Sequence, residues 1–131
     1  EVSVPESFLM IPMDAVLIEQ VLINLLENAL VHAHSTKPIL CYVQEHADAA
    51  SFHVRDFGVG IAPERIQTIF DGMPYSGNER SDSSRGIGIG LSICKTIIHA
   101  HGGMINVVNH EQGAEFYFTL PKSTEEEKGT V

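Results

Sequence analysis

The longest hydrophobic pattern of the chain lies near its beginning, at residues 15–33. Apolar side chains in this segment cover most of the circumference of a helix, which predicts a helix buried on nearly all sides. Asp14 precedes the segment and is expected to cap the helix by accepting from its first free backbone N–H groups. Three polar residues recur at intervals of four and therefore form one stripe on this helix: Gln20, Asn24 and Asn28.

Short runs of apolar and β-branched residues predict strands in other parts of the chain. One strand is expected at residues 8–12, and a hairpin is expected from 39–44 and 51–56. Two more strands are expected near the end of the chain, at 104–109 and 114–120. Apolar and more polar residues alternate in the last of them, so one face of the sheet should pack and the other should stay more open.

Two further helices and a long loop complete the pattern. A short helix is predicted at residues 62–70, because Pro63 suits the first turn of a helix. Another helix is predicted at 89–101, before Gly102. Residues 71–85 show no hydrophobic periodicity and consist mainly of glycine, proline, serine, asparagine and charged residues. A loop of this length usually has a function.

Composition narrows the class of protein. A chain of 131 residues fits one domain with its own core. Its 17 acidic and 8 basic residues give a net charge of −9, which disfavours nucleic acid and anionic lipid as partners. Cys41 and Cys94 are far apart, which suits reduced thiols in the cytoplasm. With no long apolar stretch, we expect a soluble domain without membrane contact, and the missing Met at its start favours excision from a longer protein.

The asparagines of the first helix are candidate ligand-binding residues. A carboxamide buried on an apolar helix costs about 1–3 kcal/mol unless it is hydrogen-bonded. Asn24 and Asn28 therefore either form hydrogen bonds within the core or bind a ligand. Amide oxygens suit Mg²⁺ alongside phosphate oxygens and water, and both interpretations remain open on the residues alone.

A second candidate follows the predicted hairpin, where the sequence from Asp56 to Gly60 reads D-F-G-V-G. A carboxylate beside closely spaced glycines offers an acceptor next to backbone that a flat ligand can approach. A plain turn is the alternative. The D-F-G of eukaryotic-type protein kinases is disfavoured, because the chain lacks the V-A-I-K and H-R-D motifs and only 55 residues precede Asp56.

A third candidate is the glycine-rich segment from Arg85 to Leu91, R-G-I-G-I-G-L. Gly86, Gly88 and Gly90 would leave bare backbone N–H groups at the start of a helix, where phosphate is favoured. The segment matches neither the dinucleotide fingerprint nor the P-loop. A flexible hinge is the alternative.

Six motifs occur in a specific order, and together they resemble the ATP-binding catalytic domain of sensor histidine kinases. This domain belongs to the superfamily of gyrase, Hsp90, histidine kinases and MutL (GHKL). The likeness covers residues 7–121, and the sequence is most similar to the Kdp-type potassium-sensing kinases. The motifs are L-I-N-L-L-E-N-A-L at 22–30, D-F-G-V-G-I at 56–61, I-F-D at 69–71, R-G-I-G-I-G-L at 85–91, H-G-G at 101–103 and G-A-E-F-Y-F-T-L-P at 113–121.

The resemblance implies an α+β fold, a two-layer α/β sandwich (Bergerat fold) with a mixed, mostly antiparallel sheet covered on one face by three helices. It places the catalytic domain at residues 1–121 and leaves 122–131 as a charged tail, which we expect to be disordered. It also implies ATP and Mg²⁺ as cofactors. Such a domain is expected in the cytoplasm, as the cytoplasmic portion of a membrane-bound sensor kinase.

By the same resemblance, Asn28 would coordinate Mg²⁺ and Asn24 would support the phosphate end of ATP. Asp56 would accept from the adenine amino group, and Phe70 would anchor the start of a lid at 71–85. The other implied nucleotide-binding residues are Gly58, Gly60 and Ile61 at the adenine and Gly86, Gly88, Gly90 and Leu91 over the phosphates. Arg80, Arg85 and His32 are the candidates to replace the phosphate-side cations that the family pattern has and this sequence lacks.

The implied reaction transfers the γ-phosphate of ATP to a histidine on a separate dimerisation and phosphotransfer domain, so no catalytic residue is expected in this fragment. The response regulator is an indirect partner, and the isolated domain is expected to be a monomer. Asn24 stands where ATP-hydrolysing relatives have a carboxylate base, which favours a kinase over a GHKL-type ATPase.

Three departures keep a further alternative open. Val31 stands where a Lys or Arg is common, Phe57 replaces the usual Asn of D-N-G, and residues 73–77 read M-P-Y-S-G instead of F-x-R-G. A non-catalytic nucleotide-sensing or interaction module with the same fold is therefore the alternative.

Overall fold

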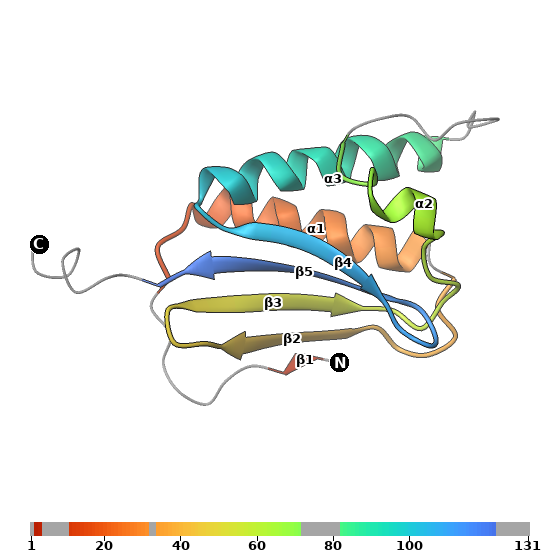
Figure 1. Cartoon of the computed structure of the whole chain (residues 1–131), viewed down its shortest axis with the longest axis horizontal. Helices are drawn as coiled ribbons and strands as arrows, with labels where there is room; N and C mark the ends of the chain where they lie inside the picture. The colour runs from red at the N-terminus through yellow and green to blue at the C-terminus, as the bar shows by residue number, and fades with distance from the viewer. Residues whose placement is uncertain (1, 4–10, 32–33, 72–81, 123–131) are drawn as a thin grey trace, which may run out of the picture.

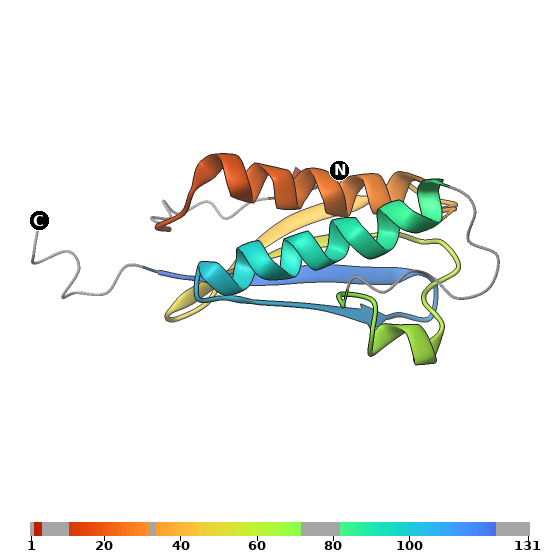
Figure 2. The ribbon, with the colours of Figure 1, turned by 90° about the horizontal axis from the view of Figure 1, so that it is seen from above.

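The chain folds into two layers, a five-stranded sheet and three helices that all lie on one of its faces (Figures 1 and 2). The structure, a computed structural model, describes residues 2–3, 11–31, 34–71 and 82–122, with backbone only at 3 and 82–89. The α+β two-layer sandwich expected from the family resemblance is confirmed.

The sheet has the strand order β1-β2-β3-β5-β4. The short edge strand β1 pairs parallel to β2, and the other neighbours pair antiparallel. The four long strands begin and end within two residues of the predicted positions. The strands are β1 (Val2–Ser3), β2 (Leu40–Glu45), β3 (Ala49–Arg55), β4 (Met104–Asn109) and β5 (Ala114–Pro121).

The strand predicted at residues 8–12 is not found where the structure describes this segment. Ile11 and Pro12 lie outside any strand, and residues 8–10 lie outside the described part of the chain. Pro12 has no backbone N–H to donate to a neighbouring strand, which disfavours sheet pairing here. The parallel edge position is instead taken by β1.

Helix α1 (Ala15–Val31) begins as predicted, because Asp14 caps it. Its Oδ1 accepts from the backbone N–H groups of Val16 and Leu17 at 3.1 and 3.2 Å. The prediction that this helix is buried on nearly all sides is wrong: Val16 and Leu30 are 75% and 71% exposed. In a two-layer fold a helix packs against the sheet and one neighbouring helix, so its outer side faces solvent. The buried residues are Ile18, Val21, Leu25 and Ala29.

The other two helices differ from prediction at one end. Helix α2 (Pro63–Ile66) is only one turn long and ends before the predicted residue 70. Helix α3 (Asp82–Ala100) begins seven residues before the predicted start at 89. Residues 82–84 are Asp-Ser-Ser, types that favour helix starts, and the glycines that follow lower helix propensity by only about 1 kcal/mol each.

The core lies between the helices and the sheet. Phe116, Phe118 and Leu120 of β5 point into it and are almost completely buried. At the far end of the helix layer, His101 follows α3 and joins it to α1. Its Nε2 accepts from the Asp14 N–H at 3.0 Å, while its Nδ1 lies 2.8 Å from the carbonyl oxygen of Ile97.

Candidate functional site

The three candidate segments of the sequence, the helix asparagines, the D-F-G-V-G segment and the glycine-rich segment, meet at one end of the molecule. At this end β3 and α1 end and α3 begins (Figures 1 and 2). Asp56, directly after β3, is 2% exposed. Its Oδ1 accepts from the backbone N–H groups of Gly58 at 2.9 Å and Ala114 at 3.2 Å. Among the described residues, no donor contacts its second oxygen, Oδ2. The side chain is therefore oriented by two backbone groups and keeps one oxygen able to accept from a ligand.

Gly113 packs against Asp56 from the turn between β4 and β5. A Cβ at this position would lie 2.2 Å from the Asp56 carbonyl oxygen and 2.8 Å from its Oδ1, and its φ of +89° also favours glycine. Only glycine allows this approach. Gly113 begins the motif at 113–121, which was the available signal in the sequence. No role was predicted for it, because its partner Asp56 lies far away in the chain.

Phe57 is held both through its backbone and through its ring. Its backbone N–H donates to Ser35 Oγ at 2.9 Å, and its carbonyl accepts from the Thr36 N–H at 3.2 Å and Thr36 Oγ1 at 3.1 Å. Its ring lies 4.5 Å from the guanidinium carbon of Arg55 and 5.4 Å from the ammonium of Lys37. The segment after α1 therefore fixes the loop backbone at Phe57.

The other end of this loop is fixed by Asn109, the last residue of β4. Its Oδ1 accepts from the Ile61 N–H at 2.9 Å, and its Nδ2 donates to the Ile61 carbonyl at 2.7 Å. Gly60 adopts φ +79°, and a Cβ on it would lie 3.1 Å from Asn109 Oδ1. Sequence reasoning missed Asn109, since no motif includes it. Loop 56–61 is thus held at both ends by residues distant in sequence.

The two helix asparagines have different surroundings. Asn24 Oδ1 accepts from Gln20 Nε2 at 3.1 Å, and its Nδ2 donates to the carbonyl of Gly90 at 3.4 Å and lies 3.6 Å from Cys94 Sγ. Asn24 therefore joins α1 to α3. Asn28 is half-buried and makes no hydrogen bond to any described residue. No described residue therefore occupies its amide.

The glycine segment takes a different form from the prediction. Gly86, Gly88 and Gly90 lie inside α3, so by helix geometry its first free N–H groups belong to residues 82–84 rather than to the glycines. Leu91 is 1% exposed and packs in the core, so it does not line a ligand surface in this structure.

The remaining predicted residues divide between core and undescribed positions. Phe70 is 9% exposed and meets Phe116 edge to face at 6.1 Å, so the segment that begins at Asp71 starts from a buried anchor. Ile61 is partly buried against the same core. His32 and Arg80 lie outside the described residues, and of Arg85 only the backbone is described.

Among the residues that the structure describes, no group of three or more His, Cys, Asp and Glu side chains is arranged to hold a metal ion. A Mg²⁺ ion at Asn28 would therefore depend on ligand oxygens for much of its coordination. None of the described helices is both long and apolar enough to cross a membrane.

Comparisons with known proteins agree with these features. A family model described as histidine kinase-, DNA gyrase B-, and HSP90-like ATPase matches residues 13–124. The chain is 46% identical to Sensor protein KdpD of Clostridium acetobutylicum and 39% identical to Sensor protein KdpD of Escherichia coli, each over 123 residues. These alignments cover 93% of this chain but only 14% of each relative.

Solved structures give the same result. The catalytic domain of histidine kinase ThkA is 32% identical with a TM-score of 0.76, and the match covers 94% of this chain and 79% of that one. Full-length ShkA in complex with AMPPNP is 29% identical with a TM-score of 0.76, over 94% of this chain and 25% of that one. The resemblance predicted from the six motifs is confirmed. The chain belongs to the family of histidine kinase-, DNA gyrase B- and HSP90-like ATPases, as a catalytic domain of the sensor histidine kinase type.

Proposed function

We propose that this domain binds ATP with Mg²⁺ and that the protein to which it belongs transfers the γ-phosphate to a histidine on a separate domain. The observation that carries the proposal is Asp56, whose Oδ1 is fixed by two backbone N–H groups while Oδ2 has no partner among the described residues. A buried carboxylate oriented in this way is a specific acceptor for the amino group of adenine. The AMPPNP complex of ShkA supports nucleotide as the ligand class.

The second half of the site is assigned to Asn28. Its amide oxygen is a suitable Mg²⁺ ligand, and the ion would share its remaining positions with phosphate oxygens and water. The net charge of −9 makes the ion important, because an acidic domain repels a polyanion that has not been neutralised. Asn24 and Gly90, which touch each other, would lie beside the phosphates.

Phosphoryl transfer requires positioning and charge neutralisation more than covalent chemistry by the protein. Within this proposal the domain supplies positioned ATP, and the acceptor histidine belongs to a dimerisation and phosphotransfer domain of the longer protein. A response regulator would then receive the phosphoryl group. We further propose that the isolated domain is a monomer in the cytoplasm.

The test is a titration of the chain with AMPPNP and Mg²⁺. We expect Asp56→Asn to weaken binding by at least about tenfold, which is about 1.4 kcal/mol, because an amide nitrogen would then face the adenine amino group or the loop N–H groups. The matched control is Asp48→Asn in the exposed turn between β2 and β3. Equal affinities of the Asp56 variant and the wild type would contradict the proposal.

One observation favours the non-catalytic alternative. Val31, at the end of α1, is 55% exposed at a position where the family resemblance leads us to expect a Lys or Arg. Loss of that cation would weaken transition-state stabilisation more than binding. Labelled ATP and an added phosphoacceptor domain separate the two functions: a labelled histidine supports the kinase, and binding without transfer supports the nucleotide-sensing module.

A further inference from the structure

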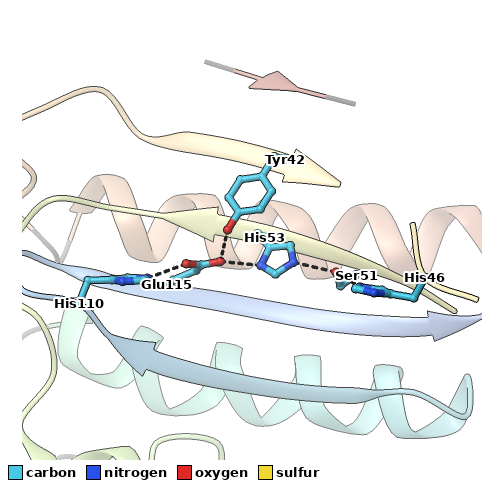
Figure 3. A network of polar contacts seen from close by, with 6 residues as sticks. All are labelled: Tyr42, His46, Ser51, His53, His110 and Glu115. Atoms are coloured by element: carbon cyan, nitrogen blue, oxygen red, sulfur yellow. Dashed lines mark hydrogen bonds and ion pairs between the residues drawn. The ribbon is translucent and has the colours of Figure 1, made fainter. Parts of the chain in front are cut away.

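The face of the sheet opposite the helices carries a network of polar side chains centred on Glu115 of β5 (Figure 3). Its Oε2 accepts from the Tyr42 hydroxyl and lies 2.6 Å from His53 Nδ1. Its Oε1 lies 2.6 Å from Nε2 of His110. The three partners come from β2, β3 and the turn after β4. Glu115, only 7% exposed, therefore ties three segments to β5.

Which atoms of this network carry protons follows from the chemistry of Glu115, because an ionised carboxylate accepts hydrogen bonds but does not donate them. His53 Nδ1 and His110 Nε2 must therefore carry protons. Burial acts to raise the pKa of Glu115, but the hydrogen bonds from Tyr42, His110 and His53 prevail and lower it, which keeps the carboxylate ionised. Each carboxylate oxygen thus has a fixed donor.

The turn between β4 and β5 is the part of this network that reaches the nucleotide loop. His110 is bound to Glu115 through its side chain, and its backbone N–H donates to the Gly113 carbonyl at 3.0 Å. The residue before it, Asn109, holds both backbone polar groups of Ile61. On the other side of the turn, Gly113 packs against Asp56.

Contacts from this one turn therefore reach both ends of loop 56–61. We propose that Asn109 is a positioning residue for nucleotide binding, and that the His110–Glu115 pair positions the turn that carries Asn109 and Gly113. This inference rests on the proposed function, because it assigns a role relative to a bound adenine. In this proposal Asn109, His110 and Glu115 act through the loop and not through contact with the nucleotide.

The position of Asn109 indicates that its side chain affects nucleotide binding more than the global stability of the domain. Asn109 is exposed at the end of a strand, and its two hydrogen bonds join it to a loop rather than to the core. Exposed hydrogen bonds contribute little to global stability because water replaces them in the unfolded state. Their loss should act on the loop and so on binding.

The experiment compares AMPPNP binding in the presence of Mg²⁺ by the wild-type chain, Asn109→Ala and Asn109→Asp. We expect Asn109→Ala to weaken binding about tenfold. Asn109→Asp keeps an acceptor for the Ile61 N–H but loses the donor to its carbonyl, so an intermediate loss is expected. Asn106→Ala is the matched control, because Asn106 is an exposed asparagine on the same strand whose side chain, among the described residues, bonds only its neighbour Val107.

A second measurement excludes a merely structural effect. In labelled transfer to an added phosphoacceptor domain, Asn109→Ala should raise the KM for ATP about tenfold and leave kcat unchanged, since the chemistry at the phosphates is not altered. Glu115→Gln and His110→Ala should each raise KM, and the double variant should raise it no further than the larger single effect, because the two residues act as one pair.

The outcomes distinguish the inference from the proposed function. Unchanged affinity of Asn109→Ala together with lost affinity of Asp56→Asn overturns the inference and leaves the proposed function intact. Failure of the wild-type chain to bind AMPPNP overturns both. A graded loss from wild type through Asn109→Asp to Asn109→Ala, with Asn106→Ala equal to wild type, supports the inference.

Discussion

The two ends of the proposed nucleotide site are built differently. The base end, loop 56–61 with the residues that hold it, has its backbone fixed through Ser35, Thr36, Asn109 and Ala114. At the phosphate end, formed by Asn24, Asn28 and Gly90, Asn24 bonds only side chains and one carbonyl of the helices, at 3.1 Å to Gln20, 3.4 Å to Gly90 and 3.6 Å to Cys94 among the described residues. Asn28 has no hydrogen-bond partner among these residues. The backbone of the base end is therefore fixed by the fold, whereas in the proposed site the phosphate end would gain contacts from the ligand and the ion.

The largest expected effect comes from Gly113→Ala at the base end. The added Cβ would overlap the Asp56 carbonyl oxygen, and the positive φ would be strained, so we expect a loss of at least about 3 kcal/mol in the free energy of unfolding and loss of nucleotide binding. Urea unfolding and AMPPNP titration measure the two effects.

Gly90→Ala is the matched control at the phosphate end. Its Cβ would lie 3.8 Å from Asn24 Cγ, an ordinary contact, and alanine favours a helix by about 1 kcal/mol over glycine. The variant should be as stable as wild type or more stable. Equal destabilisation at both glycines would contradict the difference between the two ends.

The second prediction concerns Asn28. Asn28→Ala should weaken AMPPNP binding in the presence of Mg²⁺ by about tenfold, or about 1.4 kcal/mol, while the free energy of unfolding changes by less than about 0.5 kcal/mol. The reason is that its amide bonds no described residue. Without Mg²⁺ the variant and the wild type should bind equally weakly, and a large effect under that condition would argue against metal coordination by this residue.

The smallest expected effect is the dependence of stability on the charge of Glu115. Its pKa is lowered in the folded state, because hydrogen bonds outweigh burial, so its contribution is complete above the ordinary value of 4.5 and is lost as pH falls through the lower folded value. Glu115→Gln should therefore be less stable than wild type by about 1 kcal/mol at pH 5, and the difference should shrink towards pH 3.

Urea midpoints at pH 5 and pH 3 test this sign under conditions in which imidazoles are ordinarily already charged. The groups that face Glu115 are Tyr42, His53, His110 and the register partner Arg55. Glu111→Gln, an exposed change in the same turn, is the control and should show no such trend. A difference that grows towards pH 3 would show that the pKa is not lowered.

Features set by neighbours in sequence were predictable. The alternation in β5 indicated the packed face of the sheet, and Asp14 indicated the start of α1, because both depend on local geometry. Asp56 could be selected for the same reason, as a carboxylate beside glycines at the end of a strand. The predicted start of α3 at residue 89 is wrong, because the helix begins at Asp82 and the two serines after it and continues through the glycines.

Features set by topology were not predictable from the residues. Asn109 and Gly113 reach loop 56–61 only because β5 lies between β3 and β4 in the sheet. The exposure of Val16 and Leu30 depends on how many layers of structure pack around α1. The apolar pattern of the helix does not contain this information. The contacts of Asn109 and Gly113 with loop 56–61 therefore follow from the fold and not from the sequence pattern.

His101 has one further consequence for the arrangement of the helices. Its ring donates from Nδ1 to a carbonyl at the end of α3 and accepts at Nε2 from the first backbone N–H before α1. Only the uncharged Nδ1–H tautomer can do both, since a second ring proton would point at the Asp14 N–H. The contact between Asn24 and Gly90 depends on the packing of α1 beside α3. This packing thus requires the His101 imidazole to remain neutral, so that it can join the backbone at the start of α1 to the backbone at the end of α3.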